Sequence, residues 1–286
     1  MCRKLLLAAT VMLALAAAPA AALAGKPAAP TPATTPSATT PAPADTPRRK
    51  AGPQERAVAD RLDPLARSAF WAREADIDPT DAVAGVHLAA ALRAMGQYGQ
   101  AIITAQQVLT IDPNNYDALL ETARAFVAQG QGFYAVDPAK KAIALAPRDW
   151  RPLSLIGVAY NQVQRGDDAQ AAWRQALALS PDNPDVLSNM AMAVAAQGDS
   201  AQAESLLRRA VAQPAASLQV RQNLTLILGL QGKLTEAEKL LREDLPPPLA
   251  DANLAYLQAA SSRDPAPVAA SQSNDHSWNR LKGAGG

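Results

Sequence analysis

Few residues of this chain belong to the types that usually carry protein chemistry. Among its 286 residues are one cysteine and two histidines, and 4% are aromatic. The cysteine, Cys2, lies in an N-terminal segment with the pattern of a removable leader. Removal of this leader together with Cys2 would exclude disulfides, thiolate metal sites and cysteine nucleophiles from the processed chain. The imidazoles of His87 and His276 lack metal-ligand spacing. We therefore predict no catalytic residue, no cofactor and no metal site.

An excess of positive charge is also missing. The chain has 27 Lys and Arg residues against 26 Asp and Glu residues, a net charge of +1. Nucleic-acid binding requires a basic patch that neutralises phosphates and often uses exposed aromatic rings for stacking. Nor is there a glycine-rich phosphate loop, because Gly130-Gln131-Gly132 lacks a third glycine. We predict neither a nucleic-acid partner nor a small-molecule substrate.

The first 24 residues have the pattern of a secretory signal peptide. Arg3 and Lys4 precede an apolar run over residues 5–18, and Ala22-Leu23-Ala24 is a small-residue cleavage site. The run is shorter than the roughly 20 residues that a membrane-spanning helix needs, which favours a cleaved signal peptide. An uncleaved membrane anchor is the alternative. Residues 25–57 are rich in Pro, Ala and Thr and predict an extended linker.

The most informative feature that is present is a 34-residue period without gaps. With units starting at Ala82, the eleventh position is large and apolar, the fifteenth is Gly in four of five units, and the thirty-second is Pro in the first three. Alanine occupies the twentieth position throughout, as Ala101, Ala135, Ala169, Ala203 and Ala237. The small residue allows close helix contact, the glycine permits a left-handed helix end, and the proline stops the second helix.

This period resembles the tetratricopeptide repeat, a helix–turn–helix unit that stacks into a superhelix. The predicted fold is an all-α tetratricopeptide-repeat superhelix with five repeats over residues 82–249. Residues 58–81 are interpreted as a degenerate N-terminal capping repeat with a truncated first helix. After the break at Pro246-Pro247-Pro248, residues 250–260 are predicted to form a C-terminal capping helix, and residues 261–286 a disordered tail.

The last repeat carries a more specific resemblance. It reads Val220-Arg221-Gln222-Asn223-Leu224 and Leu228-Gly229-Leu230-Gln231-Gly232, followed by Asp244-Leu245-Pro246-Pro247 and Ala252-Asn253-Leu254-Ala255-Tyr256-Leu257. These residues resemble the C-terminal end of the TadD proteins of the tight-adherence (Flp) pilus assembly system. The resemblance implies a non-enzymatic periplasmic scaffold, associated with the outer membrane, with protein partners such as the secretin.

One departure from that family concerns the leader. Many TadD-like proteins carry a lipid-acceptor cysteine directly after a Leu-Ala-Gly site, whereas Leu23-Ala24-Gly25 is followed here by Lys26. We therefore expect a periplasmic protein without a lipid anchor. An adaptor for another envelope machine, such as cytochrome maturation, exopolysaccharide export or cell-wall synthesis, is the alternative.

In tetratricopeptide folds, the second, fifth, ninth and twelfth positions of the first helix commonly face the concave groove. This resemblance assigns partner binding to Arg93, Asp117, Arg124, Arg151, Ser154, Asn161, Asp185, Ser188 and Gln222. Arg93, Arg124 and Arg151 fall on successive helices, and guanidinium groups pair two-point with carboxylates. They predict a track for an acidic or C-terminal carboxylate segment. The alternative is a solvated face with local ion pairs, such as Arg124 with Asp117.

Four other residues have competing interpretations. His87 is either the centre of an active site on the repeat surface or a partly exposed helix residue, the interpretation that we favour. Tyr116 and Trp150 open repeats two and three, where packing at the repeat junction is expected. Trp278 is either a short docking motif or part of a disordered tail.

Overall fold

The computed structural model describes residues 49–261. The predicted leader, most of the predicted linker, and the tail with Trp278 lie outside these residues. Within them the chain forms thirteen helices and no strand, which confirms the all-α prediction. The helices are α2 (Pro53–Ala59), α3 (Pro64–Ile77), α4 (Ala82–Ala94), α5 (Tyr98–Ile111), α6 (Tyr116–Ala128), α7 (Gly132–Leu145), α8 (Trp150–Gln162), α9 (Gly166–Leu179), α10 (Pro184–Ala196), α11 (Ser200–Val211), α12 (Leu218–Leu230), α13 (Leu234–Asp244) and α14 (Pro247–Ser261).

Each predicted repeat is one pair of helices, and its turn has the expected geometry. The backbone is left-handed at Gly96, Gly130, Gly198 and Gly232, with φ between +75° and +98°. In repeat three Gln164 adopts the same conformation, with φ of +64°. The N–H that follows each of these residues bonds back to the carbonyl of the eleventh position, as Gln97 does to Leu92 over 2.9 Å. This bond closes the first helix and turns the chain into the second.

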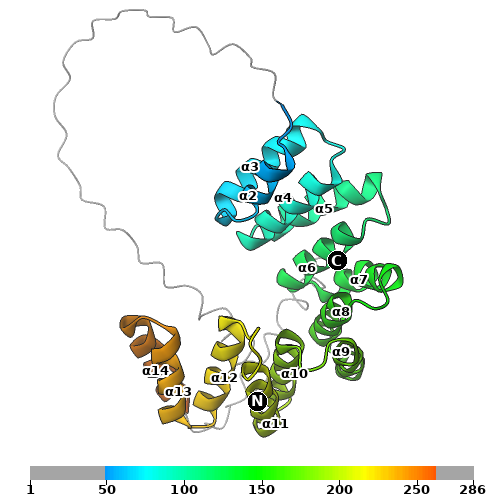
Figure 1. Cartoon of the computed structure of the whole chain (residues 1–286). Coiled ribbons are helices and arrows are strands. Elements are labelled where there is room, and N and C mark those ends of the chain that lie inside the picture. Colours follow the sequence, from blue (N-terminus) through cyan, green and yellow to red (C-terminus); the bar gives the residue numbers. More distant parts are fainter. Residues whose placement is uncertain (1–48, 262–286) are drawn as a thin grey trace, which may run out of the picture.

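The five alanines of the twentieth position are buried, with at most 1% of their surface exposed. Each first helix contacts both the second helix of its own repeat and the first helix of the next repeat. Second helices of neighbouring repeats, in contrast, are not packed backbone to backbone, and α11 and α13 meet through the ion pair of Arg208 with Glu236 at 2.7 Å. The helix pairs therefore follow an arc with the first helices on the inner side (Figure 1).

Both ends of the repeat array differ in detail from the predicted boundaries. Helix α2 begins at Pro53, inside the segment that the composition assigns to the linker. Its start is fixed by Glu55, whose carboxylate accepts the Gly52 N–H at 2.6 Å. Helix α14 begins at Pro247, three residues before the predicted start. Proline is tolerated in the first helical turn, because the N–H that it lacks would have no partner inside the helix.

None of the helices between residues 49 and 261 is long and apolar enough to cross a lipid bilayer.

Candidate functional site

Two of the three predicted groove arginines converge on one carboxylate that the sequence did not single out. Arg93 of α4 donates from Nε and Nη2 to Glu121 of α6, at 2.8 and 3.1 Å. Arg124, one turn further along α6, donates from Nη1 to the same carboxylate at 3.0 Å. The Glu121 side chain is 5% exposed, while about a third of each arginine side chain remains exposed. The structure therefore replaces the expected pair of Arg124 and Asp117 with a cluster around Glu121.

The electrostatics of this cluster follow from its burial. Burial acts to raise the pKa of Glu121, but the hydrogen bonds and charge of Arg93, together with Arg124, outweigh it, so the pKa lies below its ordinary value. Glu121 is thus held ionised between two cations. The cluster carries one unit of positive charge, with the arginine edges at the surface.

The third arginine of the proposed track is already paired with a neighbouring carboxylate. Arg151 donates from Nε to Asp149 at 2.8 Å, and its guanidinium lies over the ring of Tyr116. The Tyr116 hydroxyl donates to the same carboxylate at 2.8 Å. Hydrogen bonds from Arg151 outweigh burial and lower the pKa of Asp149 to about 2, and burial raises that of Tyr116 to about 12. Tyr116 therefore ties repeat two to repeat three, which confirms its packing role.

Ser154 and Ser188 are buried and do not present free hydroxyls to a partner. The side-chain amide of Asn189 donates to the Ser154 hydroxyl at 3.4 Å, and that of Asn223 donates to Ser188 at 2.9 Å. Each pair links one first helix to the next. Of the remaining predicted groove residues, Asp117 and Asp185 are exposed, and Asn161 and Gln222 are half-buried.

Glu121 was missed because position-based reasoning considered only four positions of each first helix. It occupies the sixth position, like His87, Asn189 and Asn223 in other repeats. The sequence signal for Glu121 was a carboxylate at the sixth position of the first helix in the repeat that follows Arg93.

His87 belongs to the contact between α2 and the first full repeat. Its Nδ1 lies 2.7 Å from Asp60, and its ring packs on Trp71 with a centroid separation of 4.4 Å. Trp71 also donates from Nε1 to Asp60, at 3.1 Å. Within residues 49–261, no group of three or more His, Cys, Asp or Glu residues is placed to hold a metal ion.

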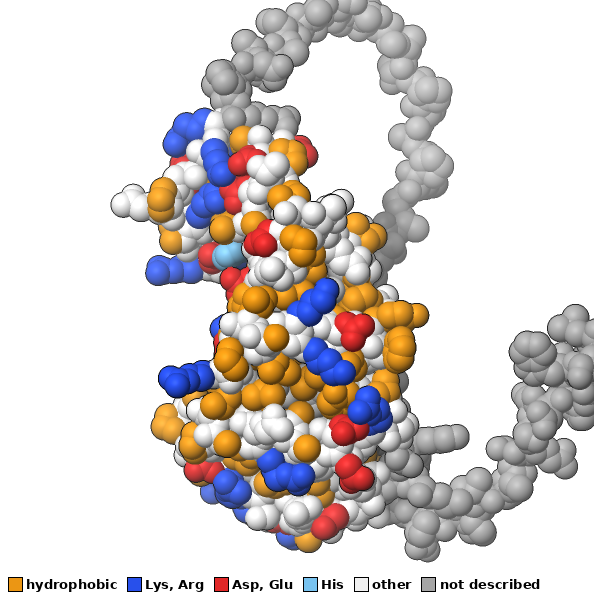
Figure 2. Space-filling model, turned by 90° about the vertical axis from the view of Figure 1, so that its right-hand side faces the viewer, with side chains coloured by type: hydrophobic (Ala, Val, Ile, Leu, Met, Phe, Trp, Pro, Cys, Tyr) orange, Lys and Arg blue, Asp and Glu red, His pale blue; other side chains and the backbone are white. Residues whose placement is uncertain are grey.

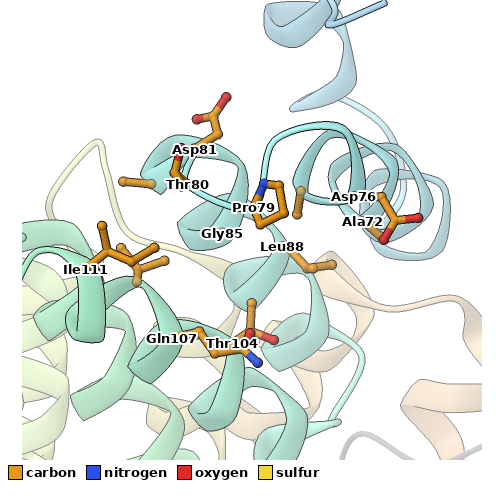
Figure 3. A pocket seen from close by; sticks show the side chains of 13 residues that line it. Ala72, Asp76, Pro79, Thr80, Asp81, Gly85, Leu88, Thr104, Gln107 and Ile111 are labelled. Atoms are coloured by element: carbon orange, nitrogen blue, oxygen red, sulfur yellow. The ribbon is translucent and has the colours of Figure 1, made fainter. Parts of the chain in front are cut away.

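A second candidate surface is a hollow of about 360 Å³ on the outer side of the arc. Gly85 and Leu88 of α4 form the floor of the hollow, and residues of α3 and α5 form its walls (Figure 3). The hollow lies between α3 and α5 because the backbones of these two helices are not packed together. Small side chains, among them Ala72, Ala75 and Pro79, leave it open. Asp76 and Asp81 line it, and no Lys or Arg side chain does.

An exchange between two repeat positions distinguishes repeat one, where the hollow lies, from the next three repeats. In repeats two, three and four, the fourth position is a buried leucine and the twenty-seventh is a buried alanine, in the pairs Leu119 with Ala142, Leu153 with Ala176, and Leu187 with Ala210. Repeat one has Gly85 and Val108 instead. A Cβ on Gly85 would lie 2.4 Å from Val108 Cγ2, so the valine has moved into the glycine's space. Gly85 and Val108 both line the hollow.

Charged side chains of both signs are interspersed on the face that Figure 2 presents, and neither forms a continuous patch there. This distribution agrees with the balanced composition. It offers no broad electrostatic surface on that face for a polyanion such as nucleic acid.

Comparison with known proteins supports the repeat assignment. Two family models described as tetratricopeptide repeat match residues 160–227 and 86–115. A search of curated protein sequences found no significant match.

Solved structures of low identity with a similar fold include two tetratricopeptide-repeat proteins and one hetero-tetramer. A thermophilic tetratricopeptide protein from Thermus thermophilus is 22% identical, with a TM-score of 0.56 over 62% of this chain and 98% of that one. A repeat protein from Parabacteroides merdae is 14% identical, with a TM-score of 0.54 over 72% and 85%. The APC/C hetero-tetramer Cut9–Hcn1 is 17% identical, with a TM-score of 0.56 over 72% and 40%.

At these identities the structural likeness shows the fold alone. Such folds mediate protein–protein interactions and are generally non-catalytic. The repeat pattern, the two family-model matches and the fold together show that the helices form a tetratricopeptide-repeat superhelix.

Proposed function

We propose that this chain is a non-enzymatic scaffold of the periplasm that acts in assembly of a tight-adherence (Flp) pilus. The inner side of the arc contacts a protein partner such as the secretin. The observation that carries the proposal is the C-terminal segment of about residues 218–260, whose sequence resembles TadD proteins.

That segment is a closely packed unit, which supports its use as a recognisable module. Arg221 Nε lies 2.7 Å from Asp244 Oδ1, joining α12 to α13. A Cβ on Gly229 would come within 2.6 Å of Leu257, so α14 packs directly on α12 only because glycine stands there. The residues that carry the resemblance are therefore those that close the array.

The cluster of Arg93, Glu121 and Arg124 is the part of the inner side best suited to an acidic partner. Two guanidinium groups held by a buried carboxylate are already ordered, so a partner carboxylate binds without the full entropy cost of fixing them. The charge excess of the cluster is one, which suits a single carboxylate better than an acidic run.

The test is Arg93→Glu with Arg124→Glu in the native host, with Arg174→Glu on the outer helix α9 as the matched control. We expect the double variant to lose surface pili and secretin multimers while the control retains both. Normal piliation with a stably folded double variant would contradict the assigned surface. Normal piliation after deletion of the whole gene would contradict the pilus role, and an adaptor of another envelope machine would then be favoured.

A further inference from the structure

Helix α14 packs like the first helix of a repeat, but none of the described helices follows it. In each of the five repeats the first helix contacts the second helix of its own repeat, as α12 contacts α13. A first helix also contacts both helices of the repeat before it, and α14 does so with α12 and α13 at the end of the arc (Figure 1). The side of α14 that a second helix would cover is therefore open among residues 49–261.

Two large apolar side chains lie on the open side of α14. The third and tenth positions of the first helix are buried in all five repeats, as Ala84 and Ala91, Ala118 and Ala125, Pro152 and Ala159, Val186 and Ala193, and Val220 and Ile227. Counted from Pro247, the same positions of α14 are Leu249 and Tyr256, and each is 40% exposed. Ala252, which is also exposed, lies on the same face one turn from both. We call Leu249, Ala252 and Tyr256 the α14 stripe.

The α14 stripe is unusual for the end of a repeat array. A terminal helix that faces water normally has a polar outer face, because no neighbour covers it. In α14 the buried side is held by Ala250 and Leu257, and the stripe lies on the opposite side of the helix. A stripe of this kind at the last described helix indicates that another segment covers it.

The chain that follows α14 has the spacing and the composition of such a segment. In each repeat three residues separate the two helices, as where α12 ends at Leu230 and α13 begins at Leu234. Because α14 ends at Ser261, the same spacing places the start of the covering segment at residue 265. Residues 262–264 are polar, and residues 265–270 read Pro-Ala-Pro-Val-Ala-Ala, an apolar run without charge.

Connectivity favours this segment over the rest of the chain. Residues 262–268 span at most about 24 Å when extended. The helix between Ala252 and Ser261 rises by only about 14 Å, so the segment reaches the stripe. Residues 1–48, in contrast, join the array at α2, which shares no backbone contact with α14.

We propose that residues 265–270 fold back over α14 and cover the α14 stripe in place of a second helix. Val268, the largest side chain of the segment, contacts Leu249 and Tyr256. The C-terminal end of the array is thus closed by the chain itself, and the stripe is withheld from other molecules. This inference is independent of the pilus role, since the cluster of Arg93, Glu121 and Arg124 takes no part in it.

Disulfide trapping in the full chain tests the proposal. Cys2→Ser removes the native thiol, and Ala252→Cys in the stripe is combined with Ala269→Cys in the segment. The control combines Ala269→Cys with Asp251→Cys, an exposed position next to Ala252 that points to another side of α14. The two pairs have nearly the same tether length. Under a mild oxidant we expect the intramolecular disulfide to form at least fivefold faster with Ala252→Cys. Equal rates would overturn the proposal, and a disulfide-linked dimer as the main product would assign the stripe to a second copy.

A second variant separates apolar contact from the effect of the tether. Leu249→Ser with Tyr256→Ser removes the large side chains of the stripe but leaves the buried side of α14 intact, and thermal melting verifies that the variant folds. We expect trapping at Ala252→Cys to fall to the rate of the Asp251→Cys control. Gln258→Ser, at an exposed position on another side of α14, should leave the rate unchanged. Undiminished trapping in the folded double variant would show that the segment does not pack on the stripe.

Discussion

The contacts that hold neighbouring helices together differ between the N-terminal end and the middle of the array. At the N-terminal end, Arg56 of α2 bridges Glu74 of α3 and Asp81, which caps α4, at 2.9 and 2.7 Å. Glu74 has no exposed surface, and it also accepts the Ala51 N–H. In the middle, apolar contacts such as that of Trp173 with Gly157 accompany the polar links at Glu121, Ser154 and Ser188.

The difference follows from position in the array. A central repeat covers both of its faces with neighbours, so it buries more apolar surface than a terminal helix does. The terminal helix α2 has seven residues and a neighbour on one side only, and too little apolar surface to hold it. A buried charge network fixes its position but depends on every partner being present. The end should therefore be more sensitive to charge, and the middle to volume.

The largest effect is expected from removal of the buried carboxylate in the network. Glu74→Ala leaves Arg56 without one partner and should destabilise the N-terminal end by about 3–5 kcal/mol. Hydrogen exchange would locate the loss in α2 and α3. Glu243→Ala, at an exposed position of α13, should change stability by less than about 0.5 kcal/mol. Similar effects of the two substitutions would contradict a structural network.

The next effect tests volume at the boundary between the two regions. Gly85→Leu alone overlaps Val108 and should cost about 1–3 kcal/mol. Adding Val108→Ala restores the pair of repeats two to four and should recover at least the original stability. Chemical denaturation of the single and double variants measures this coupling. Additive losses would mean that the two positions are not exchanged partners.

Acid should loosen the end before the middle. Although burial alone would raise it, the pKa of Asp81 lies well below its ordinary value because Arg56 and Lys50 donate to the carboxylate. A carboxylate with a lowered folded pKa contributes stability above its unfolded value of about 3.9, and that contribution is lost as the pH falls further. Exchange protection in α2 should therefore drop below about pH 4 while that in α9 persists. Asp81→Asn, which keeps the helix cap, should remove this difference; if the pH dependence survives, another group is responsible.

The smallest effect concerns the turn of repeat three. Gln164 adopts the left-handed conformation that glycine holds in the other four turns, so Gln164→Gly should stabilise the chain by about 0.5–1 kcal/mol. Gly130→Gln should cost a similar amount. Melting temperatures that move in the same direction for both variants would contradict this account.

The fold could be predicted from the sequence because the repeat is encoded locally. A small residue at Ala169, a turn residue at Gly130 and a stop at Pro147 each act within one helix pair, and five copies reinforce one interpretation. The start of α2 could not be predicted in this way. Its stability depends on Glu74 and Asp81, which lie 18 and 25 positions from Arg56 in sequence.

The candidate site also has features that the sequence predicts and features that only the tertiary structure fixes. The sequence by itself determined which helices carry Arg93 and Arg124, because repeat phase sets the face of a helix. Only the tertiary structure decided that both arginines meet on Glu121, that Ser154 and Ser188 are buried in contacts between helices, and that a hollow lies between α3, α4 and α5. Those outcomes depend on distances between side chains of different repeats, and packing of neighbouring repeats fixes such distances after the local pattern has formed.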